Sequence, residues 1–361
     1  KYIHVKKLDE GRIRIIRLPP GPVDRYIVKE QLYGDYIDQF VRGIYSFSKG
    51  NGVTYQIAHG HYADGWETVT KLSKFLATEG ENLPTVLTTH SLGRRKKQDC
   101  LQRGEGTEKI LDEKYNFPMR VASEEKSLQH ATRICPLSTT EKEFLEEHYQ
   151  AVEKDYRRLT ITPNGIDPAQ FSHATEEQVL ALEKELGIGD KFSLLVPSRV
   201  DPRKGQLNLV ESFNVLGKDF LEEYKIRALF IAWPEESTDY CQAINDYLKE
   251  NQLVDFVIKK PSVPHEKMPA FYDAAELIAI PSQEYFSIAM IEAMLLEKPL
   301  IASKEGGSRD AVVTGESGYL VDHNDPEQIA EAIKSIVSMS QEERMEMGTA
   351  ARERILDNYT L

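Results

Sequence analysis

The sequence predicts an α/β protein made of two doubly wound domains. Short apolar runs alternate with amphipathic stretches along its 361 residues, and this alternation is typical of parallel strands whose connecting helices cover both faces of a sheet. The length fits two domains of ordinary size. We expect domains over residues 1–172 and 173–361, because turn-forming residues at Asn164–Pro168 and a polar helix at Thr175–Leu186 separate two series of apolar runs.

Each expected strand is a short apolar run, and each expected helix is an amphipathic stretch between two such runs. The expected strands are Arg12–Leu18, Thr54–His59, Thr85–Thr89, Thr132–Leu137, Leu159–Thr162, Phe192–Pro197, Arg227–Ala232, Asp255–Ile258, Leu277–Ile280, Pro299–Ala302 and Gly318–Val321. The further expected helices are Lys29–Ser48, Thr139–Val152, Leu207–Leu216, Thr238–Asn251 and Pro326–Met339. Ligands of such folds bind at the carboxyl ends of the strands, so polar motifs that follow strands form the candidate site.

The composition indicates a cytoplasmic protein without nucleic-acid or membrane partners. The formal net charge of −13 disfavours nucleic acid and anionic membranes. The sequence shows no apolar run long enough to span a bilayer and no signal-peptide pattern at Lys1. Three widely separated cysteines argue against a disulfide framework and a zinc site and fit a reducing cytosol; they are Cys100, Cys135 and Cys241.

An acidic chain must meet a phosphate at a local cluster of bases. Such clusters occur at Arg94–Lys97, Arg203–Lys204 and Lys259–Lys260. For each cluster taken alone, a solvated helix face is the alternative interpretation. The local surroundings of a cluster must therefore decide between the two.

The first basic cluster directly follows Thr89–Gly93, a segment of small residues that contains His90 and ends an expected strand. Small residues and bases after a strand predict an anion site. A structural role for His90 alone is the alternative, but Ser91 and Lys96 beside it favour a functional role.

A second histidine motif contains His59 and His61, followed by Asp64. The two histidines are two positions apart, so on an extended segment both face the same side. Three interpretations stay open: hydrogen bonding to a sugar hydroxyl, a metal site with Asp64 as third ligand, and ordinary loop histidines.

The second basic cluster belongs to Ser198–Lys204, which follows an expected strand. Pro202 is placed to start a helix, and Lys204 then lies in the first turn, where a lone cation is unfavourable against the helix dipole. A bound diphosphate would reverse this cost. The alternative is a surface ion pair of Arg203 with Asp201, which contributes little.

Glu284 and Glu292 are eight positions apart, so on one helix both acids can look toward the same side. The polar turn before them exposes N–H groups that suit anionic oxygens. Glu292 lies in the apolar run Ala289–Leu295, where a carboxylate needs a partner such as a ribose diol; solvated acids are the alternative. Gly306-Gly307 adds a loop where backbone can approach a ligand. Acids for hydroxyls and bases for phosphates predict a nucleotide-sugar site.

These motifs, taken in order, resemble the retaining glycosyltransferases of family 4, which have the GT-B fold. The resemblance covers nearly the whole chain and implies two Rossmann-like domains facing across a cleft, the first for the acceptor and the second for a nucleotide sugar. It also implies that no metal or other cofactor is needed. The matching motifs are Val28–Glu30, His59–Asp64, His90–Arg94, Pro163–Ile166, Ser198–Arg199 with Lys204, Glu284 with Glu292, and Gly318–Val321.

The resemblance implies a role for each matching residue. Donor binding is implied for Ser198, Arg199, Lys204, Glu284, Phe286, Ser287, Ile288 and Glu292. Acceptor binding is implied for Lys29, His59, His61, Asp64, His90, Ser91, Lys96 and Arg120. Catalytic roles are implied for His90, Arg199, Lys204 and Glu284. In this scheme Arg199 and Lys204 hold the donor diphosphate, and Glu292 binds the ribose.

Several positions depart from the family pattern. Tyr285 and Ser287 replace the proline and glycine of a usual Glu-Pro-Phe-Gly, Ser308 stands where a proline often follows Gly-Gly, and Trp233 follows a strand where small residues are usual. These changes affect which donor sugar the site accepts and whether the protein is active. Because the sequence starts at Lys1, we expect the family's first strand and glycine-rich loop to be missing, which would leave an open sheet edge and an incomplete acceptor pocket.

From the resemblance we expect transfer of a hexosyl group, with retention of configuration, from UDP-glucose to a sugar phosphate such as fructose 6-phosphate. One alternative is a related transferase with another acceptor or another donor, such as GDP-mannose. A second alternative is a non-catalytic sugar-nucleotide-binding regulatory module, which the changes at Tyr285 and Ser287 favour.

Overall fold

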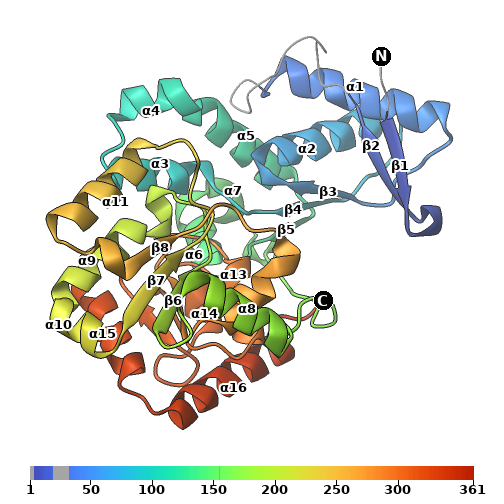
Figure 1. Cartoon of the computed structure of the whole chain (residues 1–361). Helices are drawn as coiled ribbons and strands as arrows, with labels where there is room; N and C mark the ends of the chain where they lie inside the picture. Colours follow the sequence, from blue (N-terminus) through green and yellow to red (C-terminus); the bar gives the residue numbers. More distant parts are fainter. Residues whose placement is uncertain (1–3, 19–31, 154) are drawn as a thin grey trace. The chain divides into compact units, whose positions relative to one another are not determined.

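The computed structural model describes residues 4–18, 32–153 and 155–361, and the chain divides into two compact units (Figure 1). They are Lys1–Thr162 and Pro163–Leu361, so the division comes earlier than the boundary expected between residues 172 and 173. The reason is that residues after Thr162 pack on the second unit. The Ile166 N–H donates to the Tyr359 carbonyl at 2.9 Å, and the Phe171 ring meets the Tyr272 ring edge-on at 5.9 Å.

The N-terminal unit is built on a parallel sheet of three strands in the order β3-β4-β5. The strands are β3 (Ala58–His61), β4 (Thr85–Thr88) and β5 (Arg133–Cys135). The helices are α1 (Asp35–Gly50), α2 (Tyr62–Thr78), α3 (Gly93–Gln102), α4 (Glu108–Tyr115), α5 (Phe117–His130), α6 (Thr139–His148) and α7 (Gln150–Glu153). A core of apolar side chains from α2, the sheet, α5 and α6 holds them together, including Trp66, Leu87, Leu128, Ile134 and Leu145.

The strand expected at Arg12–Leu18 forms as β2 (Ile13–Arg17), but its partner is antiparallel. It pairs with β1 (His4–Leu8) through the short turn Asp9–Gly11. Two antiparallel strands can be joined by such a turn, whereas parallel strands need a crossover of a dozen or more residues. The expectation of a parallel strand at this place is therefore wrong.

Two further expectations for the N-terminal unit fail in detail. Leu159–Thr162 makes only a single bridge, from Leu159 to Ile134, and Pro136 on the neighbouring segment has no N–H with which to extend a ladder. The single helix expected at Thr139–Val152 is broken at Tyr149, which has an extended backbone between α6 and α7.

The C-terminal unit is built on a six-stranded parallel sheet in the order β11-β10-β9-β6-β7-β8. The strands are β6 (Phe192–Val196), β7 (Ile226–Phe230), β8 (Val257–Lys259), β9 (Leu277–Ile280), β10 (Leu300–Ser303) and β11 (Tyr319–Val321). The chain adds strands in one direction from β6 to β8 and in the other from β9 to β11. The switch point therefore lies between β6 and β9, and in open α/β sheets ligands bind outside the carboxyl ends of strands at such a point.

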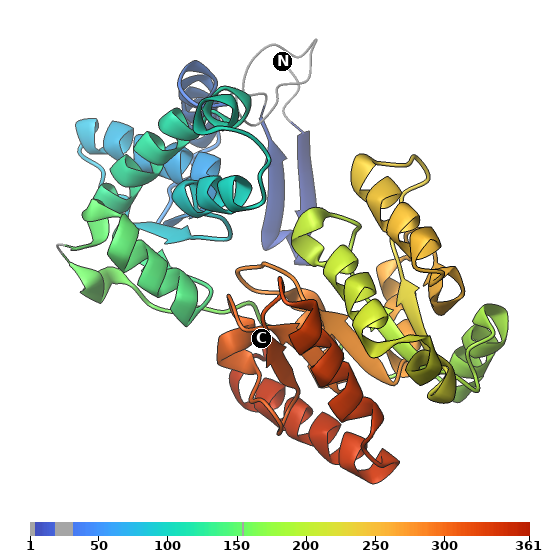
Figure 2. The same cartoon turned by 90° about the vertical axis from the view of Figure 1, so that its left-hand side faces the viewer.

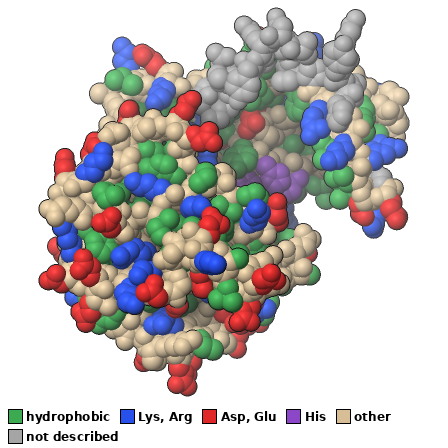
Figure 3. All heavy atoms as spheres, in the orientation of Figure 1, with side chains coloured by type: hydrophobic (Ala, Val, Ile, Leu, Met, Phe, Trp, Pro, Cys, Tyr) green, Lys and Arg blue, Asp and Glu red, His purple; other side chains and the backbone are tan. Residues whose placement is uncertain are grey.

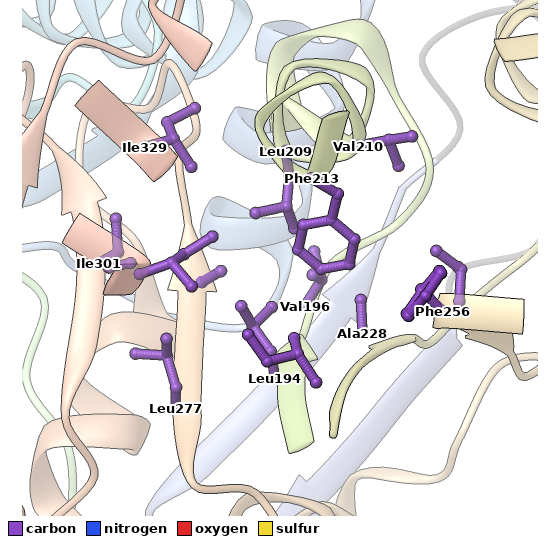
Figure 4. Packing of buried hydrophobic residues seen from close by; sticks show 14 of the residues in the cluster. Leu194, Val196, Leu209, Val210, Phe213, Ala228, Phe256, Leu277, Ile301 and Ile329 are labelled. Atoms are coloured by element: carbon purple, nitrogen blue, oxygen red, sulfur yellow. The ribbon is translucent and has the colours of Figure 1, made fainter. Parts of the chain in front are cut away.

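Helices cover both faces of this sheet (Figures 1 and 2). One layer contains α9 (Gln206–Leu216), α10 (Lys218–Glu223), α11 (Asp239–Glu250) and α15 (Pro326–Val337). Phe213 of α9 points toward Leu194 and Val196 of β6 in the core beneath this layer (Figure 4). The opposite layer contains α8 (Glu176–Leu186), α12 (Met268–Asp273), α13 (Ile288–Leu295) and α16 (Gln341–Asn358), and α14 (Ser308–Ala311) follows β10.

The helices of the described residues, α1 to α16, are 4 to 18 residues long. None of them combines the length and the apolar character that crossing a bilayer requires.

Candidate functional site

The loop after β6 carries Ser198 and Arg199, and a buried glutamine holds it in place. Gln206, which is 1% exposed, donates from Nε2 to the Ser198 hydroxyl at 3.0 Å and to the Arg199 carbonyl at 2.9 Å. Sequence reasoning missed Gln206, because its position in the first turn of α9 carries no signal of this contact. The predicted phosphate-binding loop therefore starts from a fixed backbone.

The same loop then turns against the end of β9. Gly205 has φ +71°, and a Cβ at this position would collide with the Pro281 carbonyl oxygen. The Gln283 N–H donates to the Arg203 carbonyl at 2.8 Å. The structure thus brings together the loops after β6 and β9, which flank the switch point of the sheet. A glycine and a backbone hydrogen bond fix their spacing.

The two loops also meet through Lys204 and Glu284, whose side chains form an ion pair. The Lys204 side chain is 13% exposed and the Glu284 side chain 30% exposed. Lys204 ends a short 3-10 turn before α9, so it does not lie in the first turn of the α-helix itself. The surface ion pair considered as an alternative forms as well, between Arg203 and Asp201 at 3.0 Å.

A single helix carrying both acids does not exist. Helix α13 begins at Ile288, and Glu284 lies in the loop before it, so the expectation that one helix face presents Glu284 and Glu292 is wrong. Ser287 is the N-cap residue, and a serine directly before an apolar run is a signal for this helix start. The two acids have different surroundings and different partners.

Glu292 is buried, with 7% exposure, and the sequence predicted that it needs a partner. The structure supplies Tyr272, whose hydroxyl donates to Oε2 of Glu292 at 2.8 Å. The other oxygen, Oε1, lies 3.8 Å from Nδ1 of His265. Burial raises the pKa of Glu292, while the hydrogen bond from Tyr272 and the nearby His265 act in the opposite direction. Sequence reasoning missed Tyr272 and His265, because Tyr272 lies on α12 and His265 on the 3-10 turn His265–Lys267 before it.

The residues at the start of α13 differ in exposure. Phe286 and Ser287 are buried, whereas Ile288 is 54% exposed. Ser287 makes no side-chain cap, and the first turn holds no acidic or basic residue. The N–H groups of this turn point along the helix axis and have no partner within the helix. Because Ser287 does not cap them with its side chain, that side chain does not neutralise their partial positive charge.

Gly306 and Gly307 face the loop that contains Glu284. A Cβ on Gly306, which has φ +66°, would collide with the Glu284 carbonyl oxygen, and a Cβ on Gly307 would collide with the Phe286 ring. The Gly307 N–H donates to the Tyr285 carbonyl at 2.7 Å. The sequence suggested that these glycines let backbone approach a ligand; in the structure the segment that approaches them is the Glu284–Phe286 loop.

We expect Gly306→Ala to destabilise the C-terminal unit clearly more than Gly315→Ala does. Gly315 has a similar φ of +83°, but its Cβ would meet no described atom within 4 Å. A positive φ costs alanine about 1–2 kcal/mol at either position, and the collision at Gly306 adds about 1–3 kcal/mol. Urea unfolding followed by circular dichroism measures both variants, and equal losses would contradict the close approach.

The Lys259–Lys260 cluster has partners within its own unit. The Lys259 ammonium lies 4.6 Å from the centre of the Trp233 ring and also contacts the Asn245 side chain. Lys260 pairs with Glu185 at 2.6 Å. Both lysines of this cluster therefore contact side chains of their own unit, which fits a structural role and not a phosphate site. Trp233 packs against Phe230 and Lys259.

In the N-terminal unit, four rings form a row at the carboxyl ends of β3 and β4. The His59 and His61 rings are 4.3 Å apart, which confirms that both face the same side. His61 Nδ1 lies 2.8 Å from His90 Nε2, and the Tyr62 ring stacks on His90 at 4.7 Å. Figure 3 shows histidine side chains gathered at one place of the viewed surface. The structure thus unites two motifs that are separate in the sequence.

Hydrogen bonding restricts the protonation of this row. The bond between His61 and His90 needs one donor and one acceptor nitrogen, so it forms only while at least one ring is neutral. Burial, and then the neighbouring imidazoles, lower the pKa of His59 and of His90. His59 Nε2 also lies 2.7 Å from the Thr88 hydroxyl. The His59 and His90 rings are therefore set up as neutral hydrogen-bonding groups near pH 7.

The metal interpretation of His59, His61 and Asp64 finds no support in the geometry. Asp64 lies in the first turn of α2, whereas the histidines belong to β3. Over residues 4–18, 32–153 and 155–361, no group of three or more His, Cys, Asp or Glu side chains is placed to hold a metal ion.

A carboxylate of the protein lies at the predicted anion site. The Gly93 N–H, at the start of α3, donates to both oxygens of Glu124 at 3.0 Å. Arg120 pairs with Glu124 at 2.9 Å and donates to the Ser91 carbonyl at 2.7 Å. The Gly93 N–H at the start of α3 therefore already has an anionic partner, because the Glu124 carboxylate, which is 0% exposed, occupies this position.

Three residues of the basic run Arg94–Lys97, which lies in the first turns of α3, pair with acidic side chains. Arg94 pairs with Glu125 at 3.0 Å, Arg95 with Asp99 at 2.8 Å, and Lys97 with Glu108 and Asp112. The Lys96 ammonium lies 4.6 Å from the centre of the Tyr115 ring. Lys29 lies outside the described residues. The acceptor roles of Lys96, Arg120 and Lys29 stay predictions.

Sequence reasoning missed Glu141, a buried acid directly behind the His90 loop. Its Oε2 accepts from the Thr89 hydroxyl and from the Leu137 N–H at 2.7 Å, and its Oε1 has no hydrogen-bond partner among the described residues. Burial raises the pKa of Glu141 to about 7, although the bonds from Thr89 and Leu137 act against this rise. The Ser138-x-x-Glu141 pattern is typical of a helix start and gives no hint of the burial.

We expect Glu141→Gln to flatten the pH dependence of stability. A carboxyl group whose folded pKa of about 7 exceeds its ordinary value of 4.5 contributes its full stability below about pH 4.5 and loses it as the pH rises through 7. The loss amounts to roughly 3 kcal/mol. Urea unfolding at pH 5 and pH 8 tests this, with Glu147→Gln on the exposed face of α6 as control. Equal pH slopes for wild type and Glu141→Gln would contradict the expectation.

Comparison with known proteins defines the class. Residues 180–354 match the family model Glycosyl transferases group 1. The structure resembles a sucrose-phosphate synthase from Thermosynechococcus elongatus with a TM-score of 0.77 and 24% identity, covering 99% of this chain and 81% of that one. It resembles Anabaena HepE in complex with UDP-glucose with a TM-score of 0.69 and 17% identity, covering 91% and 79%. The chain has the GT-B fold and contains a glycosyl transferases group 1 domain, which confirms the prediction of a glycosyltransferase.

Within this class, the motifs His59–Asp64 and His90–Arg94 predict a likeness to sucrose-phosphate synthase. The chain is 27% identical over 364 residues to the probable sucrose-phosphate synthase of Thermosipho melanesiensis, covering 98% of this chain and 77% of that protein. It is 28% identical over 388 residues to the sucrose-phosphate synthase of Spinacia oleracea, covering 90% of this chain but only 36% of the plant protein. The predicted likeness to sucrose-phosphate synthase is confirmed.

Proposed function

We propose that the protein transfers a glucosyl group from UDP-glucose to fructose 6-phosphate, with retention of the anomeric configuration. The observation that carries this proposal is the ion pair of Lys204 with Glu284, which joins the loops after β6 and β9 at the switch point of the C-terminal sheet. It lies inside the glycosyl transferases group 1 domain. The names of the similar proteins, and the UDP-glucose bound to HepE, support this donor and this acceptor.

In the proposed mechanism the C-terminal unit binds the donor. Arg199 and Lys204 hold the diphosphate, and Glu292 binds the ribose hydroxyls. Glu284 and the N–H groups of Phe286 and Ser287 orient the glucosyl group. A cation pair and an uncapped helix start can stabilise the diphosphate as it leaves, so no metal ion is needed in this mechanism.

The reaction proceeds on one face of the sugar. The bond from C1 to the diphosphate oxygen breaks, and the bond from C1 to the acceptor oxygen forms on the same side through an oxocarbenium-like state. The acceptor proton passes to the leaving phosphate oxygen. The protein contributes positioning and electrostatic stabilisation, and His90 lies beside the reacting sugar. His59, His61 and Ser91 supply hydrogen-bonding groups for the acceptor, with Lys96 at its phosphate.

A substrate panel tests the proposal. The protein is incubated with UDP-glucose, ADP-glucose or GDP-mannose, each with fructose 6-phosphate or fructose, in EDTA and in Mg²⁺. Mass spectrometry detects the nucleoside diphosphate and the disaccharide phosphate. We expect product from UDP-glucose and fructose 6-phosphate in both buffers. Product from GDP-mannose alone would show that GDP-mannose is the donor. Equal use of free fructose would contradict a phosphorylated acceptor. Nucleotide binding without any product would support the non-catalytic binding module.

A further inference from the structure

Tyr272 is the buried tyrosine that supports Glu292. Its side chain lies on α12 and is 0% exposed, and its ring meets the Phe171 ring edge-on at 5.9 Å. The hydroxyl lies 2.8 Å from Oε2 of Glu292 and 3.3 Å from the Ala289 carbonyl oxygen. A hydroxyl has one proton to donate, and the carboxylate at the shorter distance is the stronger acceptor.

The two oxygens of Glu292 therefore differ in what they can still bind. Oε2 accepts from the buried Tyr272 hydroxyl. Oε1 lies toward His265, whose side chain is 71% exposed and whose Nδ1 is 3.8 Å away. Among the described residues, the donor of a hydrogen bond to the Glu292 carboxylate is Tyr272. One bond thus sets which oxygen is turned inward and which is turned toward the accessible side.

We propose that Tyr272 is a positioning residue, which fixes the Glu292 carboxylate so that Oε1 is presented to the ribose hydroxyls of the donor nucleotide. This inference rests on the proposed function, because it takes Glu292 as the ribose-binding group. Without the Tyr272 hydroxyl, the buried Glu292 carboxylate has no hydrogen-bond donor from the described residues to fix the orientation of its two oxygens. It then loses its orientation, and the contribution of the ribose hydroxyls to nucleotide affinity falls.

The Tyr272→Phe variant removes the hydroxyl and keeps the ring that packs on Phe171. A tyrosine without contact to Glu292 provides the matched control. Tyr247 of α11 also has a hydrogen-bonded hydroxyl, in this case to the Asn214 side chain, so Tyr247→Phe removes an equivalent group elsewhere in the same unit. Both variants are first compared with wild type in thermal unfolding.

The test measures the affinity of UDP and of 2′,3′-dideoxy-UDP by calorimetry. The second ligand lacks both ribose hydroxyls, so the ratio of the two affinities reports on those hydroxyls alone. We expect wild type and Tyr247→Phe to prefer UDP equally, and Tyr272→Phe to lose roughly 10-fold of that preference, the low end of what removal of a supporting hydrogen bond costs at metal ligands. A purely structural loss would weaken both ligands alike and leave the ratio unchanged.

The outcomes separate the two proposals. If Tyr272→Phe keeps the wild-type preference for UDP, the positioning role is overturned while the donor site stands. If wild type binds UDP and 2′,3′-dideoxy-UDP equally well, Glu292 does not bind the ribose, and the inference falls without affecting the transfer reaction. If wild type binds neither ligand, the proposed UDP-dependent function and the inference are both overturned.

Discussion

Lys204→Ala is expected to slow glucosyl transfer by about 10²–10³-fold, the cost of losing one group that stabilises charge in the transition state. Lys204 is the last residue of the 3-10 turn after β6. Its ammonium contacts Glu284 from the loop after β9. In the proposed mechanism negative charge grows on the leaving diphosphate at this place. Removal of the cation leaves both that charge and the Glu284 carboxylate without their partner.

The effect on stability should be much smaller than the effect on rate. The Glu284 side chain is 30% exposed, so water can solvate it once Lys204 is gone, and a partly exposed ion pair contributes about 0–1 kcal/mol. This separation of rate from stability distinguishes a catalytic cation from a structural one. The measurement is initial rates with UDP-glucose and fructose 6-phosphate, together with urea unfolding of the same samples.

Lys260→Ala is the matched control for Lys204→Ala. Lys260 lies in the same unit and also pairs with a glutamate, Glu185, at 2.6 Å, so its removal changes the net charge by the same amount. We expect a rate close to that of wild type. A Lys204→Ala protein that turns over as fast as the control would refute the assigned role of Lys204.

Local patterns in the sequence located most of the fold. The central strands β6, β9 and β10 of the C-terminal unit are short runs of mostly apolar, buried residues, as Leu277–Ile280 shows with all four residues buried, and such runs are visible without a structure. The hairpin of β1 with β2 was not visible, since one apolar run gives no sign of whether its partner is parallel. The break at Tyr149 was not visible either, because the tyrosine hydroxyl bonds to Glu124, a residue 25 positions away.

In the candidate site, too, some residues could be predicted from the sequence and others could not. Residue types and the ends of strands indicated Lys204 and Glu284, but their direct contact joins residues 80 positions apart. Gln206, Tyr272 and Glu141 were missed because each acts through a partner on another element. The start of α13 was misplaced although Ser287 carried a local signal for it, so this error came from the interpretation and not from the sequence.

The largest effect on stability is expected from Glu124→Ala, which should lower the free energy of unfolding of the N-terminal unit by about 3–5 kcal/mol. The Glu124 carboxylate accepts from the Gly93 N–H, from Arg120, and from the Tyr149 hydroxyl at 2.5 Å. It is 0% exposed, and the Arg120 side chain is 12% exposed. Removing the acid leaves a largely buried guanidinium and the start of α3 without their anion, and water reaches neither easily.

Glu108→Ala provides the contrasting control on the surface of the same unit. Glu108 is 69% exposed and pairs with Lys97, which keeps Asp112 as a second partner, so its loss should cost about 0–1 kcal/mol. The chain has two tryptophans, and Trp66 is buried in the core of the N-terminal unit. In a Trp233→Phe background its fluorescence reports on that unit alone during urea unfolding. If Glu124→Ala and Glu108→Ala cost the same, the N-terminal unit does not depend on Glu124 for its stability, and the assigned role of this buried carboxylate is wrong.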